Sequence, residues 1–354
     1  MTPSQNRKPF LRRCTVTLIG VLTLWLVCFS SYGLQFKQEC GRLSDAVINT
    51  QPSVLLSGGA DAKSPDEKKA TQWFINQAKG GDYLVIRSNG LGKQAKWICQ
   101  HFRNHINSAA EISIDSIEDA SHPAVVELIE SVEIIWIAGG DQSRYHRFWS
   151  GTPLAKALNL HIKTKAIGGT SAGMAILGGA YYAPSATAIT GQQLLQNPFH
   201  QNSQDILEPG LLQHPYLHNT LNETHLDRIL KGETRSSRAF GFLARLSQSA
   251  QSARVIALNE GSFLGINPEG KGAVWGNGGY LLTTNTQPEQ MSRDQPLIWL
   301  RGHRAVTAYK LHRSSQIQQT LDFRIGVFSG FDVEYWYTTQ GRQGFNRVPH
   351  EAGH

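Results

Sequence analysis

Residues 169–173, Gly-Thr-Ser-Ala-Gly, are the stretch whose residue types and spacing most directly permit chemistry. They fit the pattern G-x-S-x-G, which exposes a serine hydroxyl when it joins a strand to a helix by a sharp turn. Apolar residues at 166–167 precede the pattern and more follow at 174–177, so both flanks suit such a turn. The sequence therefore predicts that Ser171 is a nucleophile. A tight turn with a helix-capping Ser or Thr is the alternative reading.

A serine nucleophile needs a general base and a group that orients this base. Several histidines follow the pattern along the chain, and spacing alone does not choose among these four: His200, His214, His218 and His225. The histidines show no H-E-x-x-H or similar metal-ligand spacing. We therefore expect neither a metal nor another cofactor.

Strand-like and helix-like patterns alternate around this serine. Apolar, strand-like runs occur at 52–61, 83–88, 111–117, 132–142 and 165–169, and helical spacing at 65–79, 94–106, 123–131 and 154–159. This alternation predicts βαβ units, a mostly parallel sheet and helices on both of its faces. Ligands of such sheets bind beyond the C-terminal ends of the strands. Three glycine pairs, at 58–59, 139–140 and 168–169, are expected at such ends, either near a ligand or simply in turns.

The later half of the chain has a less regular pattern. Residues 253–266 and 272–284 read as strands joined by a turn, and 296–312 as further strands, whereas 323–341 has no clear type. No linker is evident. We expect one α/β domain over residues 34–354 with a β-rich C-terminal part, and the role of residues 311–354 stays open.

The N-terminus has the features of an export signal. Arg12 and Arg13 close a basic segment, residues 14–29 are apolar, and Ser31 and Gly33 offer a cleavage site with small residues. The apolar run is short for a membrane-spanning helix. Residues 1–33 are therefore predicted to be a signal peptide that directs the protein to the periplasm or the medium, with an uncleaved N-terminal anchor as the alternative.

Charge and cysteine content narrow the class of partner. The net charge is +7, and four of the positive residues lie within the first 13, so the rest of the chain carries only +3. This excess is poor support for binding nucleic acid. Beyond the predicted signal, Cys40 and Cys99 remain, and one disulfide or two thiols fit the sequence equally well.

Four segments together resemble one known family. They are "IAGGDQ" at 137–142, "AIGGTSAGMA" at 166–175, "ETHL" at 223–226 followed by "RSSRAFGFLAR" at 235–245, and "IALNEGSFLGI" at 256–266. Their order and approximate spacing are similar to those of the cyanophycinase branch of the S51 serine peptidases. The resemblance spans roughly residues 50–310.

This resemblance implies a fold and a set of catalytic residues. The fold is a three-layer α/β sandwich similar to class I glutamine amidotransferases. The nucleophile is Ser171, the base is His225 of the "ETHL" segment, and the third member is Glu260 of "LNEG". The resemblance places the oxyanion donors on the backbone of Gly140 and Ala172.

It also implies residues that bind the substrate. Gln142 matches a substrate-contacting glutamine, and Glu223-Thr224 stand where these enzymes favour Asp-Gln. The family's arginine cluster is interrupted, because residues 227–234 look like an insertion. The substrate-binding set is therefore predicted as Gln142, Glu223, Thr224 and Arg235, with Arg228 and Arg238 competing for the role of Arg235.

The resemblance implies hydrolysis of cyanophycin, a poly-aspartate chain with an arginine on each side-chain carboxyl, to β-Asp-Arg dipeptides. An aspartyl or isoaspartyl dipeptidase of the same fold is one alternative, and its substrate would be a short Asp-containing peptide. An exported binding protein without turnover is another. A homodimer is compatible with the sequence.

Overall fold

The structure is a computed structural model that describes residues 34–43, 48–59, 65–229, 232–250, 252–312, 319–341 and 346–349. The predicted signal or anchor, residues 1–33, lies outside the described residues. Among the helices that are described, none is both long enough and apolar enough to cross a membrane.

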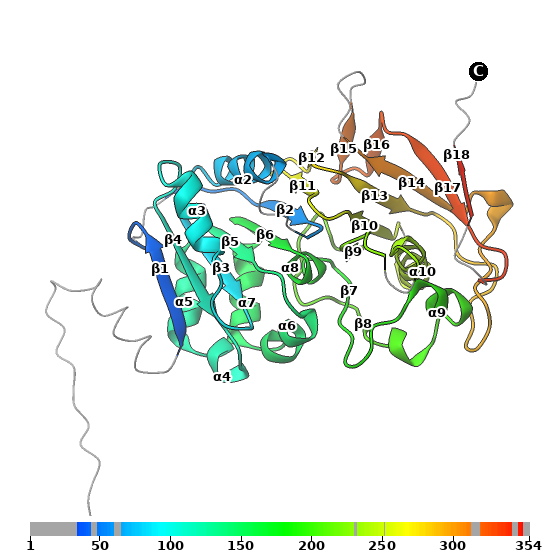
Figure 1. The fold of residues 1–354 in the computed structure, drawn as a ribbon, viewed down its shortest axis with the longest axis horizontal. Coiled ribbons are helices and arrows are strands. Elements are labelled where there is room, and N and C mark those ends of the chain that lie inside the picture. The colour runs from blue at the N-terminus through cyan, green and yellow to red at the C-terminus, as the bar shows by residue number, and fades with distance from the viewer. Residues whose placement is uncertain are drawn as a thin grey trace, which may run out of the picture.

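The larger of two main sheets has eight strands in the order β1-β4-β3-β5-β6-β2-β11-β12 (Figure 1). The five from β4 to β2 run parallel, and β1, β11 and β12 pair antiparallel at the two ends. This confirms the predicted, mostly parallel sheet. Its strands are β1 (Gln35–Cys40), β2 (Ser53–Ser57), β3 (Asp82–Arg87), β4 (Ser108–Ser113), β5 (Ile134–Ile137), β6 (Ala166–Thr170), β11 (Phe263–Ile266) and β12 (Gly272–Trp275).

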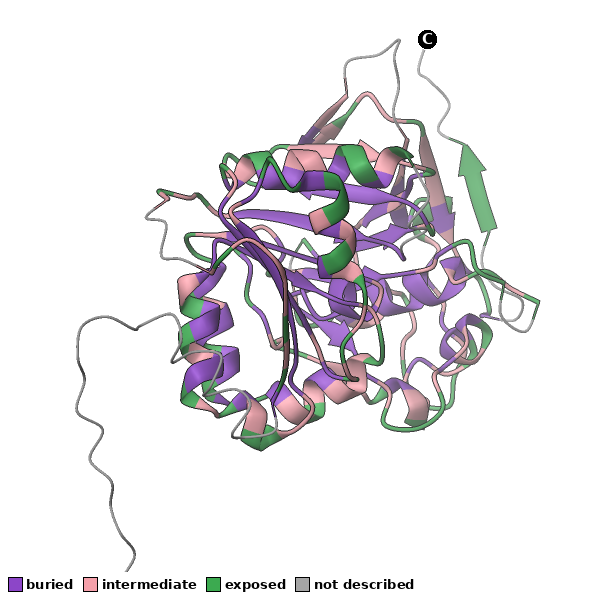
Figure 2. Cartoon of the chain, turned by 60° about the vertical axis from the view of Figure 1, so that its left-hand side comes forward, coloured by how far each residue is buried: buried purple, intermediate pink, exposed green. Residues whose placement is uncertain are grey.

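Helices cover both faces of this sheet, which gives the predicted three layers. Successive strand residues point to opposite faces. Leu55 therefore packs with Phe74 of α2 (Pro65–Gln77) and Ile98 of α3 (Gln94–Phe102). Its neighbours Val54 and Leu56 join the core with α5 (Pro123–Ser131) and α7 (Pro153–His161). Figure 2 shows the buried strands between helices whose outer faces are exposed.

A second sheet has six strands in the order β18-β17-β14-β13-β10-β9. Its strands pair antiparallel except β9 and β10, which are parallel. Helix α10 (Ser236–Leu246) packs on it, where Phe240 meets Trp299 and Trp336 in a separate core. The strands are β9 (Thr220–Glu223), β10 (Arg254–Leu258), β13 (Gly279–Thr283), β14 (Val306–Leu311), β17 (Val333–Tyr337) and β18 (Asn346–Pro349).

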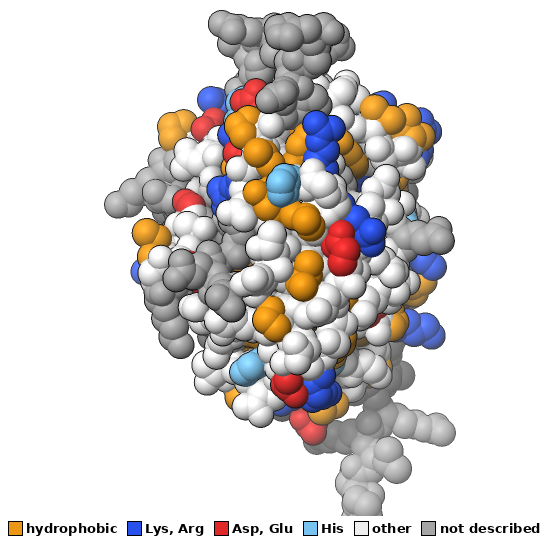
Figure 3. Space-filling view, turned by 90° about the vertical axis from the view of Figure 1, so that its right-hand side faces the viewer, with side chains coloured by type: hydrophobic (Ala, Val, Ile, Leu, Met, Phe, Trp, Pro, Cys, Tyr) orange, Lys and Arg blue, Asp and Glu red, His pale blue; other side chains and the backbone are white. Residues whose placement is uncertain are grey.

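Shorter elements complete the fold. They are α4 (Ile117–Ala120), α6 (Gln142–Trp149), α8 (Ala172–Ala175), α9 (Gly191–Gln196), the 3-10 turns η1 (Gln201–Ser203) and η2 (Arg301–His303), and the strand pairs β7 (Tyr181–Tyr182) with β8 (Ile206–Leu207) and β15 (Thr320–Asp322) with β16 (Val327–Ser329). The face at the C-terminal sheet mixes hydrophobic side chains with charges of both signs (Figure 3).

Three sequence-based expectations for the elements were wrong in part. The strand expected at 111–117 ends at Ser113, because Ser116 caps a new helix by accepting the N–H of Asp119. The strand expected at 132–142 ends at Ile137, and Asp141 caps α6. Residues 253–266 and 272–284, expected to be strands joined by a turn, each divide between the two sheets: β11 and β12 belong to the larger sheet, and β10 and β13 to the second.

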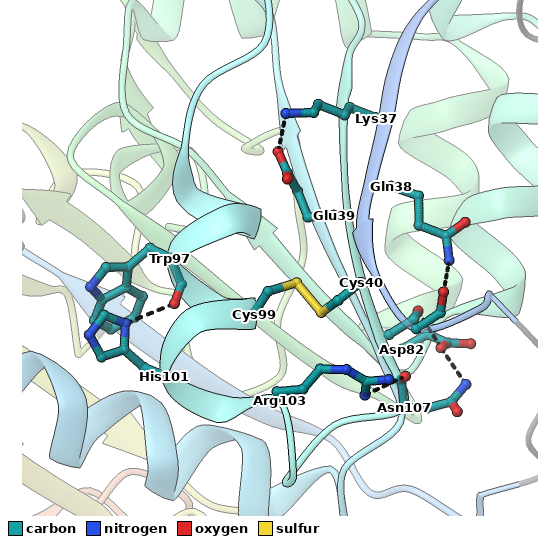
Figure 4. Close-up of a disulfide and its surroundings, with 12 residues drawn as sticks. Lys37, Gln38, Glu39, Cys40, Asp82, Trp97, Cys99, His101, Arg103 and Asn107 are labelled. Carbon is teal, nitrogen blue, oxygen red and sulfur yellow. Dashed lines mark hydrogen bonds and ion pairs between the residues drawn. A yellow bond between two sulfur atoms is a disulfide. The ribbon is translucent and has the colours of Figure 1, made fainter.

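A disulfide joins Cys40 at the end of β1 to Cys99 in α3, so the structure pairs the two cysteines (Figure 4). Both cysteines are partly buried, and they pack beside the core between α3 and the sheet. The bond fastens the antiparallel edge strand to a helix that covers the parallel strands.

Candidate active site

Ser171 stands on a sharp turn between β6 and α8. Its backbone has φ +52° and ψ −117°, a conformation that residues with a side chain rarely adopt and that is often found at functional sites. The flanking glycines make this turn sterically feasible. A Cβ on Gly169 would lie 2.5 Å from the carbonyl carbon of Gly173, and one on Gly173 would lie 2.1 Å from the carbonyl oxygen of Ile137. The local sequence therefore presents the serine as a nucleophile elbow does.

His225 lies between Ser171 and Glu260. The Oγ of Ser171 is 2.6 Å from Nε2 of His225, and Nδ1 of the same ring is 2.6 Å from Oε1 of Glu260. A carboxylate accepts only, so Nδ1 carries the proton and Nε2 is free to accept the serine O–H. This is the arrangement of a nucleophile, a general base and a group that holds the base in the required tautomer.

The topology explains why His225 and Glu260 meet although 35 residues separate them. Strands β9 and β10 are parallel neighbours with Glu223 opposite Ala257, so the loops that follow them leave the sheet side by side. The histidine and glutamate are on these loops, whereas the serine comes from the other sheet. The site therefore lies where loops from the two sheets meet. The His225 side chain is 18% exposed and the Glu260 side chain 50%.

A cavity of about 300 Å³ opens beside Ser171 and His225. The residues predicted from the sequence to bind the substrate all line it, and so does Gly140, one of the two predicted oxyanion donors. The other, Ala172, is the first residue of α8. The lining comprises Gly140, Gln142, Ser171, Ala175, Tyr182, Pro184, Ala188, Asn222, Glu223, Thr224, His225, Arg228, Arg235, Arg238 and Phe242.

The three arginines that competed in the sequence have different surroundings. Arg238 is buried and holds both carboxylate oxygens of Glu223, through Nε at 2.9 Å and Nη2 at 2.6 Å. Burial opposes its charge, but the attraction of Glu223 prevails and raises the pKa of Arg238. Its guanidinium also lies over the rings of Tyr182 and Phe242. Arg238 and Glu223 thus form a buried ion pair in the cavity wall, in which both carboxylate oxygens already have a partner.

The charge of Arg235 is less fully balanced by Glu223 than that of Arg238. Its Nη1 donates to the carbonyl of Thr224 at 2.9 Å and lies 3.6 Å from the Glu223 carboxylate that Arg238 already holds. Burial lowers the pKa of Arg235, because the attraction of Glu223 does not offset the loss of water. Arg228 is exposed. Three arginines against one glutamate leave the cavity lining with an excess of positive charge, which suits a carboxylate ligand.

Two neighbours of the triad were missed from the sequence. Asp227 accepts the backbone N–H of Glu260 through Oδ1 at 2.9 Å, and its position two residues after His225 was the available signal. The carbonyl of Gly58 accepts the backbone N–H of His225 at 2.8 Å. The glycine pair at 58–59 had been singled out as a strand end, but not its contact with the histidine.

Comparisons with known proteins identify a family that this chain resembles. Residues 53–271 match the sequence model of peptidase family S51. The crystal structure of a peptidase from an acI-B1 Actinobacterium is similar, with a TM-score of 0.50 and 17% identity over 69% of this chain and 94% of that one. A structure assigned as a peptidase E from Listeria monocytogenes EGD-e aligns with a TM-score of 0.39 and 12% identity over 67% of this chain and 100% of that one. A search of curated protein sequences finds no match.

Proposed function

Since the chain belongs to peptidase family S51 and is a serine-type peptidase, we propose that it is exported and hydrolyses cyanophycin to β-Asp-Arg dipeptides. The observation that carries this proposal is the contact of Ser171, His225 and Glu260 beside a cavity lined by three arginines. The first part of this observation supports acyl transfer, and the second supports a substrate rich in carboxyl groups.

In the proposed mechanism, Nε2 of His225 takes the proton of Ser171 as Oγ attacks an aspartyl carbonyl carbon. The backbone N–H groups of Gly140 and Ala172 stabilise the oxyanion, an effect worth about 10²–10³ in rate for one donor. The C–N bond then breaks, and His225 protonates the leaving amine. Water, deprotonated by the same ring, hydrolyses the acyl-enzyme. Throughout, Glu260 holds the Nδ1 proton and stabilises the imidazolium.

The cavity constrains which part of the polymer it can hold. At about 300 Å³ it is at the small end of ligand pockets, so we expect it to hold about one Asp-Arg unit. Arg235 and Arg228 supply the charge that a carboxylate of this unit needs. Glu223 is the acidic residue among the cavity's lining, and Arg238 holds both of its oxygens. The guanidinium of the substrate is therefore expected to point out of the cavity.

The same observation favours a second candidate function, an aspartyl dipeptidase. A cavity with spare positive charge and a fully paired glutamate suits the free side-chain carboxylate of an N-terminal aspartate. Such a substrate needs no recognition of a guanidinium.

The test is to incubate the purified mature protein with cyanophycin and, separately, with Asp-X and isoaspartyl dipeptides, and to identify products by mass spectrometry. Release of β-Asp-Arg, abolished in Ser171→Ala, is the expected result. Cleavage of the dipeptides alone would replace cyanophycin by the second candidate. Binding of the polymer without any product would favour the binding protein, and activity that survives Ser171→Ala would overturn the mechanism.

The disulfide supports the export part of the proposal, because stable disulfides form in oxidising compartments. We also propose that residues 34–354 act as one unit, since Ser171 follows a strand of one sheet and His225 and Glu260 follow strands of the other. Detection of the mature chain in the periplasm or the medium, with its N-terminus near residue 34, tests export. A full-length protein retained in the cytoplasm would contradict it.

A further inference from the structure

Three consecutive backbone carbonyls at the end of β2 accept hydrogen bonds from the three segments that carry the triad. The carbonyl of Ser57 accepts the N–H of Ser171 at 3.0 Å, and that of Gly58 accepts the N–H of His225 at 2.8 Å. The carbonyl of Gly59 accepts the N–H of Gly261, the residue after Glu260, at 2.7 Å. One short segment is therefore bonded to all three loops, although they come from two sheets.

The position of β2 in its sheet makes this possible. Its last residue pairs with Thr170 of β6 on one side and with Phe263 of β11 on the other. Strand β6 leads into the nucleophile turn, and β11 begins directly after the loop that carries Glu260. The N–H of Gly58 in turn donates to the carbonyl of Ser262 at 3.0 Å. Together with the bond from Gly261 to Gly59, this gives two hydrogen bonds between the segment and the loop that carries Glu260.

The backbone of Gly59 also lies directly against the ring of His225. Its φ of +143° is one that residues with a side chain rarely adopt. A Cβ placed on it would lie 2.4 Å from Cε1 and 2.6 Å from Nδ1 of His225. The bare backbone at Gly59 is thus the surface against which the imidazole rests. Nδ1 is the atom that donates to Glu260, so any side chain at this position must displace that donor.

We propose that Ser57–Gly59 is a positioning segment, in which the backbone sets the relative places of the triad loops and Gly59 fixes the plane of the His225 ring. This inference rests on the proposed function, because it assumes that His225 is the base for Ser171. Gly59 acts through the histidine and is therefore a positioning residue.

The experiment replaces Gly59 by Ala and compares it with Gly151→Ala. Gly151 also has a positive φ, +72°, but nothing lies within 4 Å of an added Cβ, so this control carries backbone strain without a collision. Displacement of a catalytic group by about 1 Å can cost about 10²-fold in rate. We expect Gly59→Ala to lower kcat about 100-fold and to change KM by less than about twofold. Gly151→Ala should keep both constants. Equal kinetics in the two variants would overturn the inference.

A spectroscopic measurement makes the test independent of the substrate. The Nδ1 proton of an imidazole that donates to a carboxylate gives a far-downfield proton NMR resonance. It should be present in the wild type and in Gly151→Ala and absent or shifted upfield in Gly59→Ala. An unchanged resonance in Gly59→Ala would show that the ring has not moved and would overturn the inference even if no substrate is found.

A double variant covers the case in which Gly59→Ala folds poorly. His225→Ala removes the ring that the new Cβ would meet, so Gly59→Ala should destabilise that background less than it destabilises the wild type, because only the cost of the positive φ remains. A loss of stability as large as in the single variant would place the collision elsewhere and refute the assignment. If the wild type and Ser171→Ala are equally active, the proposed function fails instead, while the resonance still reports on Gly59.

Discussion

The carboxylate of Asp227 is exposed, yet it bonds to the backbone of the residue that orients the catalytic histidine. Removing this acceptor in Asp227→Ala loosens the Glu260 loop, which stays bonded to Gly58 and Gly59. Loss of the outer-shell partners that orient metal ligands costs about 10–100-fold, and we take the lower end as the scale for this partner of a catalytic carboxylate. We expect kcat/KM to fall about tenfold in Asp227→Ala. Asp227→Asn keeps an oxygen in place and should retain most of the activity. Kinetics, together with amide exchange at Glu260, check this prediction.

Asp332 offers the matched control, because it is exposed and pairs with His312 rather than with the site. Asp332→Ala should leave the kinetics and the exchange of the Glu260 amide unchanged. A Glu260 amide that stays protected in Asp227→Ala would show that this hydrogen bond does not hold the loop.

Arg235 and Arg238 lie near the same glutamate, but we expect replacement of Arg238 to lower stability and replacement of Arg235 to weaken substrate binding. Arg238→Met would leave Glu223 buried without the partner that binds both of its oxygens, a change that costs about 3–5 kcal/mol of unfolding free energy. Arg235→Met removes a cation that is available to the substrate, while Glu223 keeps its pairing with Arg238. This change should therefore raise KM about tenfold or more with little change in stability. Thermal unfolding and steady-state kinetics of both variants check the contrast. A large loss of stability in Arg235→Met would make it a structural residue instead.

Among the site residues, the sequence could predict those that stand in a recognisable local motif. Ser171 follows from its glycine-flanked turn. His225 could not be chosen from four histidines by spacing, and Glu260 had no motif of its own, so both came from the family resemblance. The glycines at 58–59 were expected at a strand end, but the hydrogen bonds that Ser57–Gly59 accept could not be predicted, because backbone carbonyls leave no mark in residue type. The pairing of Glu223 with Arg238 was also hidden, since it depends on how α10 packs against β9.

Among the elements, the predictions held where periodicity is local and failed where pairing is distant. Residues 123–131 form α5 as their spacing indicates, with His122 as the N-cap and Pro123 as the first helical residue. By contrast, residues 253–266 and 272–284 read as strands joined by a turn, but each segment forms two strands that belong to different sheets. Instead, β10 pairs with β13 and β9, and β11 with β2 and β12. The short connection between them crosses from one sheet to the other and carries Glu260.

The disulfide between β1 and α3 belongs to the same scale. It closes a loop with a sequence separation of 59, for which the chain-entropy relation gives about 4 kcal/mol of stabilisation. Replacing both cysteines by serine should therefore lower the unfolding midpoint markedly. Kinetics should be unchanged, because β1 and β4 are on the far side of β3 and β5 from the triad strands. Denaturant unfolding of the oxidised, reduced and doubly substituted proteins checks this, and a loss of kcat would connect the edge strand to the site.

For the molecule as a whole, the strands beyond the family match extend the sheet that carries half of the site. The matched residues end at 271, and β13, which pairs with β10 so that Tyr280 lies opposite Ala257, comes after them. Strands β14, β17 and β18 continue that sheet outward. Without β13, β10 would be an edge strand next to the loop of Glu260. The C-terminal part therefore stabilises the parallel pair β9–β10, because β13 pairs with the edge of β10 that faces away from β9.

Two buried histidines connect the stability of the molecule to pH. Burial lowers the pKa of His161 and that of His214 to about 4. Each has a ring nitrogen, Nδ1 of His161 and Nε2 of His214, without a hydrogen-bond partner among the described residues. Both are therefore neutral in the folded protein at pH 7. Glu133 acts in the opposite sense, because burial raises its pKa and its contribution to stability is lost as pH rises.

The sign of the effect follows from proton binding. In the unfolded chain a histidine binds a proton below about pH 6.5, whereas in the folded protein His161 and His214 do so only near pH 4. The unfolded state thus holds more protons between these values, and the unfolding free energy falls with decreasing pH by about 1.4 kcal/mol per unit for each histidine. We expect His214→Met to remove about half of this slope, and His105→Gln, at an exposed position, to leave it intact. Urea unfolding at several values between pH 7 and pH 4 measures the slope. If His214→Met keeps the wild-type slope, the acid sensitivity comes from other groups and His214 is already protonated in the fold.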